Sequence, residues 1–77
     1  MPAPEMRSVF SSHVDSLGYD EESGELHVRF RDGNHVVYHG VPPETAGQVL
    51  TSPSIGQALH QGVRGQFRHR YLARPRR

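Results

Sequence analysis

Polar and apolar residues alternate in two neighbouring runs near the middle of the chain, over residues 26–31 and 36–39. A period of two is typical of a strand that buries one face. The turn sequence at 32–34 separates the runs, so they predict a β-hairpin. A shorter apolar run over 9–14 predicts a third strand in the same sheet.

Two loop lengths are compatible with the turn of this hairpin. A two-residue loop, 32–33, would place Val28 on the face that carries the neighbouring histidines. A three-residue loop, 32–34, pairs Val28 with Tyr38 and puts Asn34 in the left-handed position that such loops require. Because a slip of one residue turns every side chain to the other face, the apolar pattern favours the three-residue loop.

The opposite face of the hairpin then carries the polar positions of the two runs together with one valine. In this register His27 lies opposite His39. The residues predicted on this face are His27, Arg29, Arg31, His35, Val37 and His39.

Two short helices are predicted after the sheet. Prolines at 42–43 end the last strand, and residues 44–50 suit a helix with Pro43 in its first turn. A second helix begins at Ser54, where Ser54-x-x-Gln57 matches a capping box, with Ser52 as a competing cap. A stripe of apolar residues at positions 55, 59 and 63 would bury one side of this helix.

Strands followed by helices predict an α+β fold, here a small three-stranded antiparallel sheet packed on one face by two short C-terminal helices. We expect a disordered N-terminus over 1–6, a single domain over 7–71 and a basic flexible tail over 72–77. The predicted core is Val9, Leu17, Leu26, Val28, Phe30, Val36, Tyr38, Val49, Leu50, Ile55, Leu59, Val63 and Phe67. Exposed strand edges allow a dimer, but no long apolar stripe demands one.

The composition excludes several kinds of chemistry. The chain has 77 residues and no cysteine, which rules out disulfides, thiolate nucleophiles and zinc–thiolate sites. No apolar run approaches the roughly 18–20 residues of a membrane span, so we expect a cytoplasmic protein without a membrane partner. A domain this small leaves little room for a deep active site.

Catalysis is not expected from the one local cluster of suitable side chains. Ser11, Ser12, His13 and Asp15 resemble the members of a triad, but neighbours on one strand point to opposite faces. We therefore predict that the protein is not an enzyme. Six histidines are present without a compact metal-binding spacing, so neither a metal nor another cofactor is expected.

Charge is distributed unevenly along the chain. Residues 1–62 carry all eight acids and only three arginines, whereas residues 63–77 carry six arginines and no acid. A basic end on an acidic body favours a polyanionic partner. Arginine is suited to such a partner because its planar group binds phosphate through two hydrogen bonds and stacks on bases.

From Val9 to about Tyr71 the chain resembles the KTSC domain family, named for its occurrence at the C-terminus of some lysyl-tRNA synthetases and found also in free-standing small proteins. The matching motifs are Val9-x-Ser11-Ser12, Gly18-Tyr19-Asp20, Leu26-x-Val28-x-Phe30, Gly33, Val36-Val37-Tyr38, Gly40-Val41-Pro42, Ser54-x-Gly56, Val63-Arg64 and Phe67. The chain departs from the family at Val36, where relatives have an aromatic residue, and at 58–60, where Ala-Leu-His replaces a Tyr-Phe-Asn-like sequence. The resemblance implies RNA binding, which has been suggested for the family.

We therefore expect a small binding domain, with RNA as its partner. The predicted nucleic-acid-binding residues combine the polar sheet face with the basic C-terminal region: His27, Arg29, Arg31, His35, His39, Arg64, Arg68, Arg70 and Tyr71. The alternative is a protein-interaction module, or a small regulator or inhibitor of larger machinery, which would use an open strand edge or the basic tail.

Overall fold

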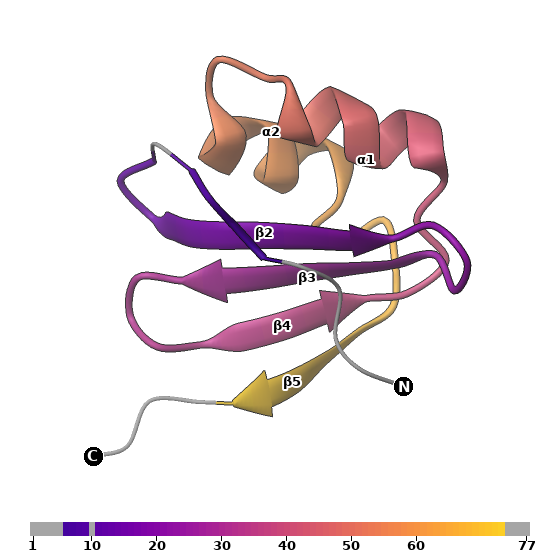
Figure 1. Cartoon of the computed structure of the whole chain (residues 1–77), viewed down its shortest axis with the longest axis horizontal. Coiled ribbons are helices and arrows are strands. Elements are labelled where there is room, and N and C mark those ends of the chain that lie inside the picture. Colours follow the sequence, from indigo (N-terminus) through magenta and orange to yellow (C-terminus); the bar gives the residue numbers. More distant parts are fainter. Residues whose placement is uncertain (1–5, 10, 74–77) are drawn as a thin grey trace.

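The computed structural model describes residues 6–9 and 11–73. Five strands form one antiparallel sheet in the order β1-β2-β3-β4-β5, and two helices separate β4 from β5 along the chain. The elements are β1 (Arg7–Ser8), β2 (Val14–Asp20), β3 (Glu25–Phe30), β4 (His35–Tyr38), α1 (Pro43–Leu50), α2 (Ile55–Gly62) and β5 (His69–Ala73). Both helices lie on the β2 side of the sheet, and β5 lies at the far edge (Figure 1).

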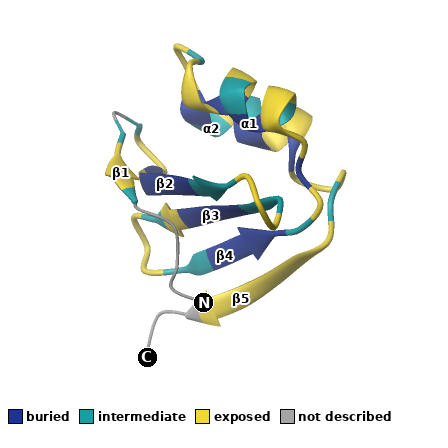
Figure 2. Ribbon diagram, turned by 45° about the vertical axis from the view of Figure 1, so that its right-hand side comes forward, coloured by how far each residue is buried: buried dark blue, intermediate teal, exposed yellow. Residues whose placement is uncertain are grey.

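The core lies between the two helices and one face of the sheet. Burial is concentrated in the central strands and on the inner sides of the helices, while β5 is exposed (Figure 2). The buried cluster is Val14, Leu17, Leu26, Val28, Val36, Tyr38, Val41, Ala46, Val49, Ile55, Leu59 and Val63. Val9, Tyr19, Phe30, Ala58 and Phe67 pack against it and are partly buried. The predicted α+β class is therefore confirmed.

The N-terminal strand prediction was wrong in its position. Residues 11–13 form a turn, and the strand begins at Val14 and continues to Asp20. Val14 and Leu17 are both buried although three positions separate them, because a bulge shifts the register between Val14 and Ser16. The extra residue breaks the period of two, which hid this strand from a pattern search.

The prediction of three strands was also wrong, because β1 and β5 extend the sheet at its two edges. β5 includes residues 72 and 73, which were expected to belong to a flexible tail. Its sequence, His-Arg-Tyr-Leu-Ala, has no apolar alternation, as is common for edge strands that carry charge. The remaining residues of the predicted tail, 74–77, lie outside the described part. The same holds for 1–5 of the predicted N-terminal segment, whose last residue, Met6, is half-buried.

The register of the central hairpin differs from the predicted one by two residues. Tyr38 pairs with Leu26 rather than with Val28, and Phe30 N donates to Asn34 O over 2.8 Å. The three-residue loop is therefore 31–33, and the left-handed conformation falls on Gly33 (φ 99°) rather than on Asn34. A shift of two preserves the faces, so the predicted core face is correct. The predicted polar face is correct only in part, because Val37 and His27 are buried on it and Arg31 lies instead on the α2 side.

Both helices form at the predicted positions. α1 has Pro43 in its first turn and buries Ala46 and Val49. Leu50, which was predicted to be a core residue, is 38% exposed because it lies about 100° around the helix from Val49. α2 follows Ser54, but the Ser54 side chain makes no capping hydrogen bond, so the predicted capping box is absent.

Candidate nucleic-acid interface

The sheet separates the predicted binding residues into two groups. In register, residues that pair across strands share a face. His27, Arg29, His35, His39 and Arg70 belong to the face away from the helices, which we call the histidine face. Arg31, Arg64 and Tyr71 lie on the other side, beside α2. Arg68 is exposed ahead of β5 and lines neither cavity described below.

Two adjoining cavities on the α2 side form a continuous groove. Their volumes are ≈ 940 and ≈ 890 Å³. Both cavities are lined by the same six residues, which make up the middle of the groove: Ser12, His13, Phe30, Arg31, His60 and Arg64. The groove therefore combines the turn before β2, the end of β3 and the C-terminal part of α2.

Arg31, an exposed residue that lines the groove, is held in place by the turn that precedes β2. Its backbone N–H donates to His13 O over 2.9 Å, and its Nε donates to Ser11 O over 2.6 Å. Ser11 is fixed in turn, since its Oγ accepts the N–H groups of His13 and Val14, each at 3.3 Å. Holding the guanidinium by Nε leaves its two terminal amino groups to bind a ligand.

Arg64 enters the groove from the end of α2. Its N–H donates to Leu59 O over 2.8 Å, and the buried Val63 anchors the preceding position in the core. α2 ends at Gly62, and Gly65 adopts a left-handed conformation, φ 79°, in the turn that follows. The arginine side chain is exposed and lines both cavities.

An aromatic row lines the second cavity where β4 meets β5. The ring centroids of Tyr38 and His69 are 5.8 Å apart, and those of His69 and Tyr71 are 6.0 Å apart. Tyr38 is buried, whereas Tyr71 is 43% exposed. Burial raises the pKa of Tyr38, an effect that the charge of Arg64 opposes and Tyr71 reinforces. The outer rings of this row can stack on a planar ligand.

The first cavity is rich in small polar groups at its other end. Hydroxyls come from Ser11 and Ser54, and an amide comes from Gln57. Gly56 lines the same wall, where an added Cβ would lie 3.7 Å from Ser11 Oγ. These groups can both donate and accept hydrogen bonds, as a sugar hydroxyl requires.

The groove is biased toward positive charge. Its permanent charges are Arg31 and Arg64 against one acid, Asp32. Asp32 is already engaged, since its oxygens accept both the backbone N–H and the side-chain amide of Asn34 at 3.0 Å. Three histidines line the groove and add further charge when protonated: His13, His60 and His69.

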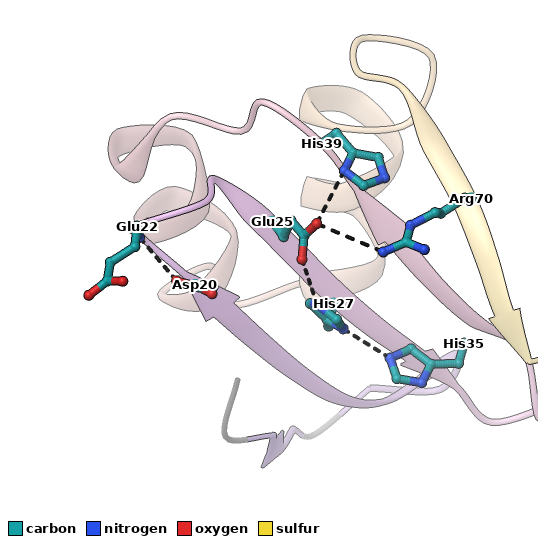
Figure 3. Close-up of polar contacts among 7 residues, drawn as sticks. All are labelled: Asp20, Glu22, Glu25, His27, His35, His39 and Arg70. Atoms are coloured by element: carbon teal, nitrogen blue, oxygen red, sulfur yellow. Dashed lines mark hydrogen bonds and ion pairs between the residues drawn. The ribbon is translucent and has the colours of Figure 1, made fainter. Parts of the chain in front are cut away.

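The histidine face is organised around a single carboxylate, Glu25 (Figure 3). One oxygen, Oε1, lies 3.4 Å from His27 Nε2, and the other, Oε2, lies 3.5 Å from His39 Nδ1 and 3.9 Å from Arg70 Nη2. His27 Nδ1 lies 3.3 Å from His35 Nε2. Several of the cations predicted to form an RNA platform therefore point toward an acid.

Two further properties reduce the positive charge that this face offers to a ligand. His27 is only 4% exposed, so it presents little surface. Burial lowers the pKa of His35, and the nearby His27 and Arg29 lower it further. The charged form of His35 is therefore disfavoured. Arg29 remains exposed at the edge of this network.

The sequence interpretation missed the groove because its walls come from distant segments. His13 was considered only as a member of a triad, and His60 only as a departure from a family pattern. No role was predicted for His69, because the sequence of β5 lacks the alternation that would predict a strand. The available signal was the number of histidines near serines and arginines, but only the fold brings 11–13, 60–64 and 69–71 together.

Membrane and metal features are not found in the part of the chain that the structure describes. None of its helices is long and apolar enough to cross a membrane. Within the same residues no group of three His, Cys, Asp or Glu side chains is arranged to hold a metal ion.

Comparison with known proteins gives consistent matches over most of the chain. A family model described as KTSC domain matches residues 10–67. A protein of Tsukamurella paurometabola is 35% identical over 63 residues, which cover 82% of this chain and 94% of the relative. An uncharacterized protein of Stutzerimonas stutzeri is 39% identical over 61 residues, which cover 79% of this chain and 84% of the relative.

A solved structure supports the same grouping. The crystal structure of a KTSC domain protein from Yersinia pestis superimposes with a TM-score of 0.87 at 28% identity, covering 91% of this chain and 99% of that protein. The family match ends at residue 67, so β5 and its aromatic residues lie beyond the matched range.

Proposed function

The chain belongs to the KTSC domain family, and on that premise we propose that it is a small binding domain for single-stranded RNA that uses the groove beside α2. The observation that carries the proposal is the placement of Arg31 and Arg64 between an aromatic row and a group of hydroxyls. Successive nucleotides of a single strand offer a partner for each of these three groups: bases, phosphates and sugar hydroxyls.

Each part of the groove suits one part of a nucleotide. The two guanidinium groups can bind phosphate oxygens and release counterions. Bases that are free of a duplex can stack on Tyr71 and His69. The serine hydroxyls and the Gln57 amide can hydrogen-bond a 2′-hydroxyl, which distinguishes RNA from DNA. Among the described residues of the histidine face no comparable combination occurs, and Arg70 there already lies near Glu25.

The proposal differs from the sequence-based expectation in the surface used. The polar sheet face was expected to form the platform, together with the C-terminal arginines. Of those residues, the proposal retains Arg31, Arg64 and Tyr71 and assigns no contact to Arg29 or Arg70. Single substitutions on the two sides can therefore separate the two surfaces.

The test is fluorescence anisotropy with a labelled single-stranded RNA, its DNA counterpart and the RNA duplex. Arg64→Gln should weaken RNA binding and reduce the slope of log affinity against log salt by about 0.7, the value for one phosphate contact on a single strand. Arg29→Gln is the matched control, because it removes an exposed arginine from the other face. Its affinity and slope should equal those of the unsubstituted protein.

Two results of this experiment would contradict the proposal. If Arg29→Gln weakens binding and Arg64→Gln does not, the histidine face is the interface and the groove is not. If none of the three nucleic acids binds at near-physiological salt, RNA is excluded as the ligand. A protein partner then becomes the leading candidate, and the exposed Tyr71 and Leu72 of the edge strand β5 would be the first surface to test.

A further inference from the structure

On the basis of the function proposed above, we propose that the middle of the groove binds the terminal phosphate of an RNA chain, a phosphomonoester at its 5′ or 3′ end. The six residues that line both cavities include two arginines, two histidines and a serine, and none of the six is acidic. All five of these polar side chains can donate hydrogen bonds to phosphate oxygens.

The two histidines come together on the surface of α2. Gly56 has no side chain, and a Cβ at this position would lie 3.8 Å from His13 Cδ2. His60 follows Gly56 by four residues in the same helix, and side chains with this spacing are neighbours on a helix surface, about 5–6 Å apart. The His13 ring therefore packs on α2 beside His60. Both histidines are exposed, so a ligand in the groove can reach them.

The two arginines are attached to the same segments as these histidines. Arg31 is joined to the turn before β2, since its N–H donates to His13 O over 2.9 Å. Arg64 follows His60 by four residues, and its N–H donates to Leu59 O over 2.8 Å, so it lies directly beyond the last turn of α2. Four basic side chains from three separate segments therefore line one part of the groove.

A terminal phosphate fits this set of side chains better than a phosphate within the chain. An internal phosphodiester carries a single negative charge, which Arg31 and Arg64 can offset without the histidines. A phosphomonoester carries a charge of about −1.5 to −2 at pH 7 and has three strong acceptor oxygens. The imidazoles of His13 and His60 supply N–H donors in either protonation state and add positive charge when they are protonated.

No acid competes with a phosphate for these side chains among the described residues of the groove. Asp32 lines only the second cavity, and its two oxygens already accept hydrogen bonds from Asn34. Within the described part of the chain, the rings of His13 and His60 make no hydrogen bond or ion pair. The histidines of the other face, in contrast, lie around Glu25.

Competition measured by fluorescence anisotropy tests the recognition of an RNA end, with the labelled RNA of the preceding experiment as the probe. The competitors are three unlabelled forms of one short single-stranded RNA: with a 5′-phosphate, with a 3′-phosphate and with hydroxyls at both ends. One phosphorylated form should compete at least about ten-fold better than the hydroxyl form, the effect of one additional hydrogen bond between charged groups, and thereby identify the end. His13→Gln and His60→Gln should each reduce this ratio to less than about three-fold. His39→Gln, on the other face, is the matched control and should keep the ratio of the unsubstituted protein.

Three results would overturn the recognition of an RNA end, and they can be told apart. Equal competition by the three forms excludes a terminal phosphate as the ligand but leaves RNA binding in the groove intact. A preference that persists in both His13→Gln and His60→Gln, or that is lost in His39→Gln, places the phosphate outside the middle of the groove. If the labelled RNA does not bind at all, the proposed function fails and end recognition fails with it. Because His13 and His60 are exposed, both variants should fold, and thermal unfolding verifies this.

Discussion

The groove beside α2 and the histidine face carry similar side chains, but they differ in whether a nearby acid offsets the positive charges. Each has arginines and histidines, yet the cations of the histidine face gather around Glu25. In the groove, Arg31 is held by a backbone carbonyl, which fixes its position without neutralising its charge. The number of cations on a surface is therefore a poor guide to anion binding unless the neighbouring acids are known.

The largest expected effect comes from removing the support of the groove. Leu59 is 1% exposed and belongs to both the core and the groove wall. Leu59→Ala should lower the free energy of unfolding by about 2–5 kcal/mol, because it leaves a cavity in a small core. Urea unfolding measures this. Leu50→Ala in α1 is the control and should cost less than about 0.5 kcal/mol, since Leu50 is exposed. Equal losses would contradict the packing of the two helices.

The next effect concerns the aromatic row of the groove. Tyr71→Ala should reduce the free energy of RNA binding by about 1–3 kcal/mol, the usual contribution of one stacked base. Tyr71→Phe should retain most of it, because the ring is kept. Leu72→Ala is the matched control, as Leu72 is the neighbouring residue with nearly the same exposure, 44%. Anisotropy titrations that give equal losses for Tyr71→Ala and Leu72→Ala would exclude stacking on Tyr71.

The histidine face should influence stability through pH. The pKa of His35 is lowered in the folded state, so the unfolded chain binds this proton more readily. Above about pH 6.5, the ordinary histidine pKa, His35 has no effect on the pH dependence, and as the pH falls below it the unfolded state is favoured. Urea midpoints measured from pH 8 to pH 5 should fall less steeply in His35→Gln than in the unsubstituted protein. A steeper fall would contradict the lowered pKa.

The smallest expected effect separates the two surfaces most directly. Glu25→Gln removes the acid that offsets the cations of the histidine face. If RNA occupies the groove, its affinity should change by less than about two-fold at near-physiological salt, where charges more than about 8 Å apart are largely screened. A marked gain in affinity would mean that the histidine face also contacts RNA once the Glu25 charge no longer pairs with its cations. Anisotropy at two salt concentrations measures both cases.

Much of the layered fold could be predicted from local patterns. The alternation around Leu26 and Val28 gave the correct buried face, and the stripe of Ile55, Leu59 and Val63 gave the correct buried side of α2. The strand β2 was misplaced because its bulge between Val14 and Ser16 interrupts the alternation. β5 was missed because the sequence of this exposed edge strand shows no apolar alternation.

The candidate site was less predictable than the fold. Arg31, Arg64 and Tyr71 were selected because of their chemistry, and all three line the groove. They had been grouped with His27 and Arg29, which lie on the histidine face. Charge and residue type could single out these three residues as candidates, but could not assign them to a surface.

The sequence by itself determined which residues face the core in the central hairpin and where the two helices begin, because these properties depend on spacing within a few residues. It also determined membership of the KTSC family. The tertiary structure alone decided the hairpin register and the addition of β1 and β5 to the sheet. It also decided that residues of 11–13 and 60–64 line one cavity together with Arg31. Those features depend on hydrogen bonds and packing between segments distant in the chain, and no local pattern encodes which distant partner a strand end will meet.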